Sequence, residues 1–247
     1  MIAAGVLDNP RVDAAFGIHM AQDLPGGTIG ICPGPMAAAP DSFNARICGL
    51  GGHAAAPHHS IDPVVVAAHC IVALQTLVSR EVNPLRQAVI TVGVLHAGTV
   101  RNIIPQEATL EATVRTFDPA IRRDLAARIP ALITGIAAAM RATAEIDYEL
   151  GYPALVNDAA LSDLARDAVT DLLGPDHVVA SEPGMFGEDM AYFLQRVPGC
   201  FFVVGSNNPA RGLIHAHHHP RFDIDDEIAL PTGVAALTTV ALRYLNN

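Results

Sequence analysis

The sequence contains no lysine and no tryptophan, and all fifteen of its basic residues are arginine. The absence of lysine excludes a Schiff-base lysine, a Walker-type phosphate lysine and a lysine general base. The basic residues face 25 acidic ones, which gives a net charge of −10 with histidine neutral. An acidic chain is a poor general binder of phosphate backbones, so we expect no nucleic-acid partner.

Cysteines are few and unpaired in sequence. The four cysteines, Cys32, Cys48, Cys70 and Cys200, form no C-x-x-C pair, which excludes a zinc knuckle and a thioredoxin motif. Their surroundings are apolar, so we predict buried thiols in a reducing compartment.

No uninterrupted apolar run is long enough to indicate a membrane span. Residues 63–78 are interrupted by His69 and Gln75, and residues 131–140 are too short to cross a bilayer. The amino terminus has no basic region followed by an apolar core. We therefore expect a soluble, cytoplasmic protein without a membrane partner.

What the chain does contain is a clear alternation of elements in its centre. Residues 42–49, 88–95, 109–116 and 145–150 are predicted as strands. Asp62-Pro63 and Asp118-Pro119 each begin a predicted helix, with Asp as the N-cap and Pro in the first turn. The order βαββαβ over residues 41–150 predicts a ferredoxin-like domain.

The flanking segments indicate an α/β layer. Residues 12–18 are predicted as a strand ending at His19, and residues 200–205 as an apolar strand. Helices are predicted over residues 158–173, 188–196 and 226–245. We therefore expect an α/β domain, formed by residues 1–40 and 151–247, into which the 41–150 domain is inserted.

Histidine is the most suggestive residue type, with eleven copies. His215, His217, His218 and His219 lie together, and imidazole is the commonest transition-metal ligand near neutral pH. Acids follow in RFDIDDE and could orient a ligating imidazole. A histidine-rich surface loop is the alternative.

Two further histidines stand at positions suited to chemistry. His19 follows a predicted strand, and ligands in open α/β sheets gather at strand carboxyl ends; a structural histidine is the alternative. His53 follows Gly49, Gly51 and Gly52, which form a flexible turn before a helix, although His53, His58 and His59 could equally be solvated loop residues.

Polar residues elsewhere in the chain can likewise be interpreted as functional or as structural. Asn102 lies in a loop between strands, where its amide could donate to a developing oxyanion. Arg115 lies in a strand, where its guanidinium either forms a structural ion pair or binds an anion. Glu188 and Asp189 lie at a predicted helix start, where a capping role is expected.

Taken in order, five motifs resemble one family. They are FGIHMAQDLPGG, GLGGHAAAPHHSIDPV, GTVRNIIPQEATLEATVRTF, MFGEDMAYFLQRVPG and HHPRFDIDDEIALPTG. The chain resembles the aminoacylase and carboxypeptidase-type co-catalytic metallopeptidases, within them the amidohydrolases related to hippurate and auxin-conjugate hydrolases. The resemblance covers residues 1–245.

The resemblance implies a role for each motif. His19 and His218 would be metal ligands, with His217 and His219 as alternatives to His218. His53, assisted by Asn102, would stabilise the oxyanion of an N-acyl amino acid cleaved by metal-activated water, and Arg115 would grip the substrate carboxylate. Two divalent ions are implied, Zn or Mn, with Co and Ni also compatible. A homodimer through the 41–150 lid domain is implied as well.

The resemblance is incomplete at one end. The family has an earlier segment with further ligands and a glutamate base, but no H-x-D pair and no Glu-Glu pair occurs in this sequence. We therefore expect a chain lacking its amino-terminal segment and inactive alone. A non-catalytic remnant that keeps the dimerising lid is the alternative, and a split enzyme completed by a second polypeptide is a third.

Overall fold

The computed structural model describes residues 1–246 and divides into two compact units. The central unit comprises Ala38–Ala154 and Met185–Gly187. The flanking unit comprises Met1–Ala37, Leu155–Gly184 and the chain from Glu188 onward. Each unit has a hydrophobic core of its own, and the chain as a whole has the mixed α/β fold that the sequence predicts.

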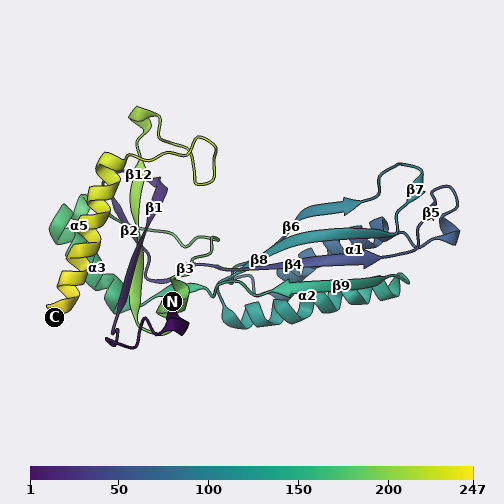
Figure 1. The fold of residues 1–247 in the computed structure, drawn as a ribbon, viewed down its shortest axis with the longest axis horizontal. Helices are drawn as coiled ribbons and strands as arrows, with labels where there is room; N and C mark the ends of the chain where they lie inside the picture. The colour runs from purple at the N-terminus through teal and green to yellow at the C-terminus, as the bar shows by residue number, and fades with distance from the viewer. Residues whose placement is uncertain (247) are drawn as a thin grey trace. The chain divides into compact units, whose positions relative to one another are not determined.

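The central unit is an antiparallel sheet with two helices (Figure 1). Its strands run in the order β6 (Ala88–Ala97), β8 (Glu107–Thr116), β4 (Ala39–Cys48) and β9 (Thr143–Glu149). Helix α1 (Pro63–Thr76) continues into a π-helical turn, Leu77–Glu81, and α2 spans Pro119–Ala139. The chain order is β4-α1-β6-β8-α2-β9.

Both helices of the central unit begin where the sequence predicts. The Asp62 carboxylate accepts a hydrogen bond from Val64 N–H, and the Asp118 carboxylate accepts one from Ala120 N–H. The alternating strands turn one face towards these helices, so that one core forms between sheet and helices. Its largest fully buried side chains include Phe43, Ile47, Leu74, Leu77, Leu110, Leu125, Ile129 and Ile133.

The flanking unit contains a mixed four-stranded sheet. Its order is β1 (Ala15–Pro25), β12 (Gly199–Asn207), β2 (Ile29–Ile31) and β11 (Val178–Ala180). Strands β1 and β12 are parallel, and β12 and β2 are antiparallel. Strands β3 (Gly34–Ala37) and β10 (Leu155–Asn157) form a separate antiparallel pair.

Strand β12 is covered on both faces, which explains its uninterrupted apolar sequence. Phe202 and Val204 belong to the core that contains residues of α3 (Ala159–Leu173) and α5 (Asp226–Leu245). Phe201 and Val203 belong to a second core that includes α4 (Ala191–Leu194). The helix predicted over residues 188–196 is present only as the four-residue α4.

The first strand differs from its prediction. Strand β1 does not end at residue 18 but continues to Pro25, so His19 lies within the strand and pairs with Val203 rather than following its carboxyl end. The strand continues because β12 supplies partners through Gly205, and then Asn207 pairs with Pro25.

Two helical segments, Pro63–Glu81 and α5, are long and apolar enough to cross a membrane by length and composition. Each also contributes buried side chains to the core of its own unit, among them Leu74 and Leu77 in the first and Ala236 and Val240 in the second. Each segment therefore packs one side against the core of its own unit.

The cysteines are free thiols, and the prediction of burial holds for Cys32, Cys70 and Cys200 but not for the half-buried Cys48. Burial raises the pKa of Cys70 to about 11, and burial likewise raises the pKa of Cys200 to about 11. Both thiols are therefore neutral near pH 7 and pack as small apolar groups.

These thiols make the fold sensitive to alkaline pH. A pKa raised by folding contributes stability that is present below the unfolded pKa and is lost as pH rises through the folded value. We expect the free energy of unfolding to fall between about pH 9 and pH 11. No lysine titrates in this range, because the chain has none.

The measurement is urea unfolding across that range for the native chain and for a Cys70→Ala/Cys200→Ala variant. The variant should show a shallower decline, whereas Cys48→Ala serves as the matched control and should keep the native slope. Equal slopes in all three proteins would contradict the prediction.

Candidate functional site

Two predicted site residues, His53 and Asn102, are brought together by a small backbone pairing in the central unit. Strand β5 (Gly52–His53) pairs with β7 (Ile103–Ile104), with His53 opposite Ile103. Ala54 N–H donates to the Asn102 carbonyl oxygen at 3.2 Å. Both site residues are exposed, so their polar groups are available to a ligand.

The loop that carries His53 is held by hydrogen bonds on both sides. Gly51 N–H donates to Gln106 Oε1 at 3.0 Å, and Gln106 Nε2 donates to the Gly49 carbonyl oxygen at 2.9 Å. A Cβ at Gly49 would lie 2.2 Å from the Ile61 carbonyl oxygen, and a Cβ at Gly52 would lie 2.3 Å from Ser60 Oγ. The glycines predicted to form a flexible turn therefore serve a close approach of backbone and side chain.

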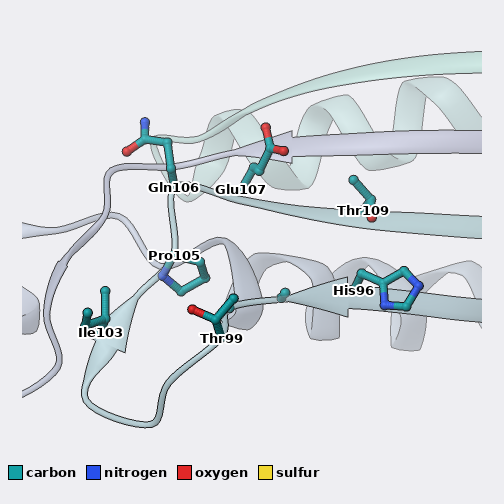
Figure 2. Close-up of a pocket in the computed structure, with 9 residues that line it drawn as sticks. His96, Thr99, Ile103, Pro105, Gln106, Glu107 and Thr109 are labelled. Carbon is teal, nitrogen blue, oxygen red and sulfur yellow. The ribbon is translucent and has the colours of Figure 1, made fainter.

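An open cavity of about 340 Å³ lies beside this pairing (Figure 2). Ile103 of β7 is shared by the cavity and the pairing with His53, but neither His53 nor Asn102 lines the cavity. The other lining residues come from the end of β6, the following loop and the start of β8: His96, Ala97, Gly98, Thr99, Pro105, Gln106, Glu107 and Thr109.

The Arg115 guanidinium is occupied by the protein itself. Its Nε donates to the Met185 carbonyl oxygen at 3.1 Å, and Nη1 donates to the carbonyl oxygens of Asp41 (3.3 Å) and Val114 (3.1 Å). Nη1 also donates to the Thr113 hydroxyl. Within residues 1–246 no carboxylate pairs with Arg115, so the predicted structural ion pair is wrong. The grip on a substrate carboxylate stays a prediction, with Nη2 as the remaining donor.

In the flanking unit, His19 faces another histidine. The ring centroids of His19 and His217 lie 5.5 Å apart, and the His217 ring also contacts Phe222 at 4.9 Å. The structure thus places the ring of His217 beside His19, whereas the family resemblance implies His218 as the ligand. His218 itself has a left-handed backbone, with φ of 67°.

The remaining histidines of this loop are engaged elsewhere. The His215 and His219 rings stack with centroids 4.3 Å apart. His219 Nδ1 accepts a hydrogen bond from Arg221 N–H at 3.0 Å. This bond occupies one ring nitrogen of His219, which makes it the weaker alternative to His218 as a ligand.

Electrostatics in this loop favour neutral imidazole. Burial, and then the neighbouring His19 and His218, lower the pKa of His217. Burial, and then Arg221 and His219, lower the pKa of His215. Neutral imidazole is the form that binds a metal ion, so both shifts favour ligand behaviour.

One acid near this loop, Asp225, holds the base of the loop through two side chains. Buried Asp225 binds Arg211 Nη1 at 2.8 Å and Asn208 Nδ2 at 2.5 Å, which closes the base of the loop. Gln22 Nε2 donates to the carbonyl oxygens of Leu213 and Asp223. The orienting role of RFDIDDE towards a ligating imidazole stays a prediction. The buried Gln22 gave no signal in sequence.

Glu188 and Asp189 lie just before α4 instead of inside it. Glu188 Oε1 accepts a hydrogen bond from Met190 N–H at 3.2 Å, and the Glu188 carbonyl oxygen accepts one from Ala191 N–H at 3.2 Å. The Asp189 carbonyl oxygen accepts one from Tyr192 N–H. This is consistent with the expected local role at a helix start.

Residues 1–246 contain no group of three or more His, Cys, Asp or Glu side chains arranged to hold a metal ion. A pair of ions needs more ligands than His19 and one loop histidine provide. The residues of this chain therefore do not by themselves fit a two-metal centre.

The small number of metal ligands predicts that chelation leaves the thermal stability of this chain unchanged. Metal ions stabilise a fold only if they bind the folded state tightly. We expect EDTA to leave the thermal unfolding midpoint of this chain unchanged within about 1 °C, measured by calorimetry. The control is the same scan after dialysis against Zn²⁺. A drop of several degrees on chelation would mean that the chain holds a metal unaided.

The chain is similar to a known protein family and to several characterised proteins. The family model described as "Peptidase family M20/M25/M40" matches residues 1–243. The chain is 41% identical to N-acetyl-L-cysteine deacetylase of Bacillus subtilis, covering 92% of this chain and 52% of the relative. It is 38% identical to IAA-amino acid hydrolase ILR1-like 4 of Arabidopsis thaliana, covering 99% of this chain and 56% of the relative. The chain thus spans a little over half the length of these curated relatives.

A solved structure agrees with the sequence relatives. The Bacillus subtilis protein YXEP, described as a dinuclear metal binding peptidase of this family, superposes with a TM-score of 0.75 at 32% identity. The match covers 98% of this chain and 60% of that one. The family resemblance drawn from the five motifs is confirmed, and the chain belongs to peptidase family M20/M25/M40, among its amidohydrolase members.

Proposed function

We propose that this chain is the larger part of a metal-dependent amidohydrolase that cleaves N-acyl amino acids to a carboxylate and an amino acid. The carrying observation is the family match over residues 1–243. It is supported by relatives named for a deacetylase of an N-acetylated amino acid and a hydrolase of an amino acid conjugate. The small N-acyl amino acid is the expected partner.

Within this proposal the central unit handles the substrate. His53 and Asn102, joined through the β5–β7 pairing, would donate hydrogen bonds to the scissile carbonyl oxygen as it gains charge. Arg115 would bind the free carboxylate through Nη2, because its other donors are engaged with the protein. A preorganised guanidinium suits this task because little side-chain freedom remains to be lost on binding.

The flanking unit would contribute imidazoles to a metal centre. His19 and His218 are the proposed ligands, and the ring contact with His19 supports His217 as the alternative. In the complete enzyme two ions, Zn or Mn, with Co or Ni also compatible, would be bound by these and by ligands outside the described set. Imidazole ligands do not select among these metals.

We propose that residues 41–150 form a ferredoxin-like lid domain, and that residues 1–40 and 151–247 form the catalytic domain. The strand order β6-β8-β4-β9 with two connecting helices supports the lid assignment. The same domain would pair two copies into a homodimer. Strand β6 is an edge strand, and Val72 on α1 is 70% exposed, so apolar surface is available for a second copy. A soluble, cytoplasmic enzyme is proposed.

The small number of metal ligands favours a second candidate function. Since residues 1–246 hold no group of three metal ligands, the chain could be a non-catalytic remnant that keeps the dimerising lid. A split enzyme completed by a separate polypeptide is compatible with the same observation.

Hydrolysis assays separate these functions. N-acetyl-L-cysteine, N-benzoyl amino acids and an indoleacetyl amino acid would each be offered with Mn²⁺ or Zn²⁺. The assay would use this chain and an extended polypeptide carrying the amino-terminal segment that the family resemblance implies. Activity in the extended protein supports the amidohydrolase. Inactivity of the extended protein towards every substrate contradicts it and favours the remnant.

A further inference from the structure

The His53 ring makes one hydrogen bond whose direction is fixed. Ala55 N–H donates to His53 Nδ1 at 3.0 Å. A backbone N–H has no lone pair to offer, so the ring nitrogen must be the acceptor. Neutral imidazole carries one proton on one of its two nitrogens. With Nδ1 acting as acceptor, that proton belongs on Nε2.

The surrounding backbone holds this bond in place. Ala54 N–H donates to the Asn102 carbonyl oxygen at 3.2 Å, and Ala56 N–H donates to the His53 carbonyl oxygen at 2.8 Å. Three successive amides, from Ala54 to Ala56, are thus all engaged. The amide that donates to the ring is thus held within a turn whose neighbouring amides are also hydrogen-bonded.

A second histidine of the chain shows the opposite arrangement. His19 Nδ1 lies 2.8 Å from the Met20 carbonyl oxygen. A carbonyl oxygen can only accept, so Nδ1 of His19 carries the proton and its Nε2 keeps a lone pair. The backbone therefore prepares His19 as an electron-pair donor and His53 as a hydrogen-bond donor.

We infer that the Ala55 backbone amide fixes His53 as the Nε2–H tautomer, which makes this imidazole a neutral hydrogen-bond donor and excludes neutral His53 as a base at Nε2. The assignment of the acceptor as a scissile carbonyl oxygen rests on the proposed function. The tautomer does not, because it follows from the hydrogen bond alone. Ala55 is in these terms a positioning residue.

Nitrogen NMR tests the tautomer in the intact chain. Long-range proton–nitrogen correlation spectra would be recorded on uniformly ¹⁵N-labelled protein at about pH 8, where a histidine with an ordinary pKa is neutral. His53→Gln assigns the resonances by their loss. We expect the pattern of a single tautomer, with a protonated Nε2 and an unprotonated Nδ1. A protonated Nδ1, or averaged shifts of two exchanging tautomers, would overturn the inference.

Variants at Ala55 test the cause. Ala55→Pro removes the donor and should move the two ring nitrogens towards averaged shifts, whereas Ala55→Gly keeps the N–H and should keep the native pattern. Unchanged ring shifts in a folded Ala55→Pro protein would contradict the role of the amide. Should this variant fail to fold, the wild-type spectrum still decides the tautomer.

A functional comparison then tests the consequence in the extended, active protein. Gln places an amide N–H₂ near the position of Nε2, and Asn places one nearer to Nδ1. We expect His53→Gln to retain about tenfold more kcat than His53→Asn, since only the former keeps a donor at the required distance. Equal kcat values in the two variants would contradict the donor role. The NMR result stands separately from any failure of the hydrolysis assay.

Discussion

Replacing Asp41 by alanine is expected to destabilise the central unit by about 3–5 kcal/mol, because it removes a buried carboxylate that forms an ion pair with the largely buried Arg122. The Asp41 side chain is 1% exposed, and its carboxylate accepts from Arg122 Nε at 2.9 Å and Nη2 at 2.6 Å. It also accepts from Gly151 N–H at 2.9 Å and from the Tyr148 hydroxyl at 3.3 Å.

Urea unfolding of the intact chain, followed by circular dichroism, measures this loss. Arg46→Ala is a matched control, because Arg46 forms exposed ion pairs with Glu107 and Glu145 and such pairs contribute about 0–1 kcal/mol. An Asp41→Ala/Arg122→Met double variant should recover part of the lost stability, since it also removes the positive charge that Asp41 neutralises. A loss below about 1 kcal/mol for Asp41→Ala would show that this cluster does not stabilise the unit.

The second large effect is expected at His53 in the extended protein that the proposed function calls for. His53→Ala should lower kcat by roughly 10²- to 10³-fold with a smaller change in KM, because an oxyanion donor acts mainly in the transition state. Steady-state kinetics on an N-acyl amino acid measures both constants.

His59→Ala is the control for this experiment. His59 is an exposed histidine of the same loop, and its ring contacts His58 with centroids 3.9 Å apart. It should leave kcat within about twofold, since it has no role in the proposed chemistry. A change in KM alone for His53→Ala would assign His53 to ground-state binding and contradict the oxyanion role.

The long elements of this fold are predictable from sequence because local signals define them. Asp62-Pro63 and Asp118-Pro119 mark helix starts, and the alternation in residues 109–116 marks a strand. Strands β2 and β11 have three residues each. Three residues are too few for periodicity to reveal, and these strands exist only because distant partners pair with them.

The candidate site is likewise predictable from sequence only where local signals define it. The motifs identify His53 and Asn102 as residue types suited to the chemistry, but their proximity depends on β5 and β7, which have two residues each. The partners of Arg115 are mostly backbone carbonyls, which have no sequence signature. Likewise, the family resemblance implies His218 as the ligand, whereas the structure places the ring of His217 beside His19.

Because side chains cover both faces of β12, this strand also determines which parts of the flanking unit unfold locally first. This strand has hydrogen-bonded neighbours on both edges, β1 and β2, and core side chains on both faces. Local opening begins where few buried contacts are lost. Local opening should therefore start at the edge strand β11 and at the histidine loop, while β12 stays in place.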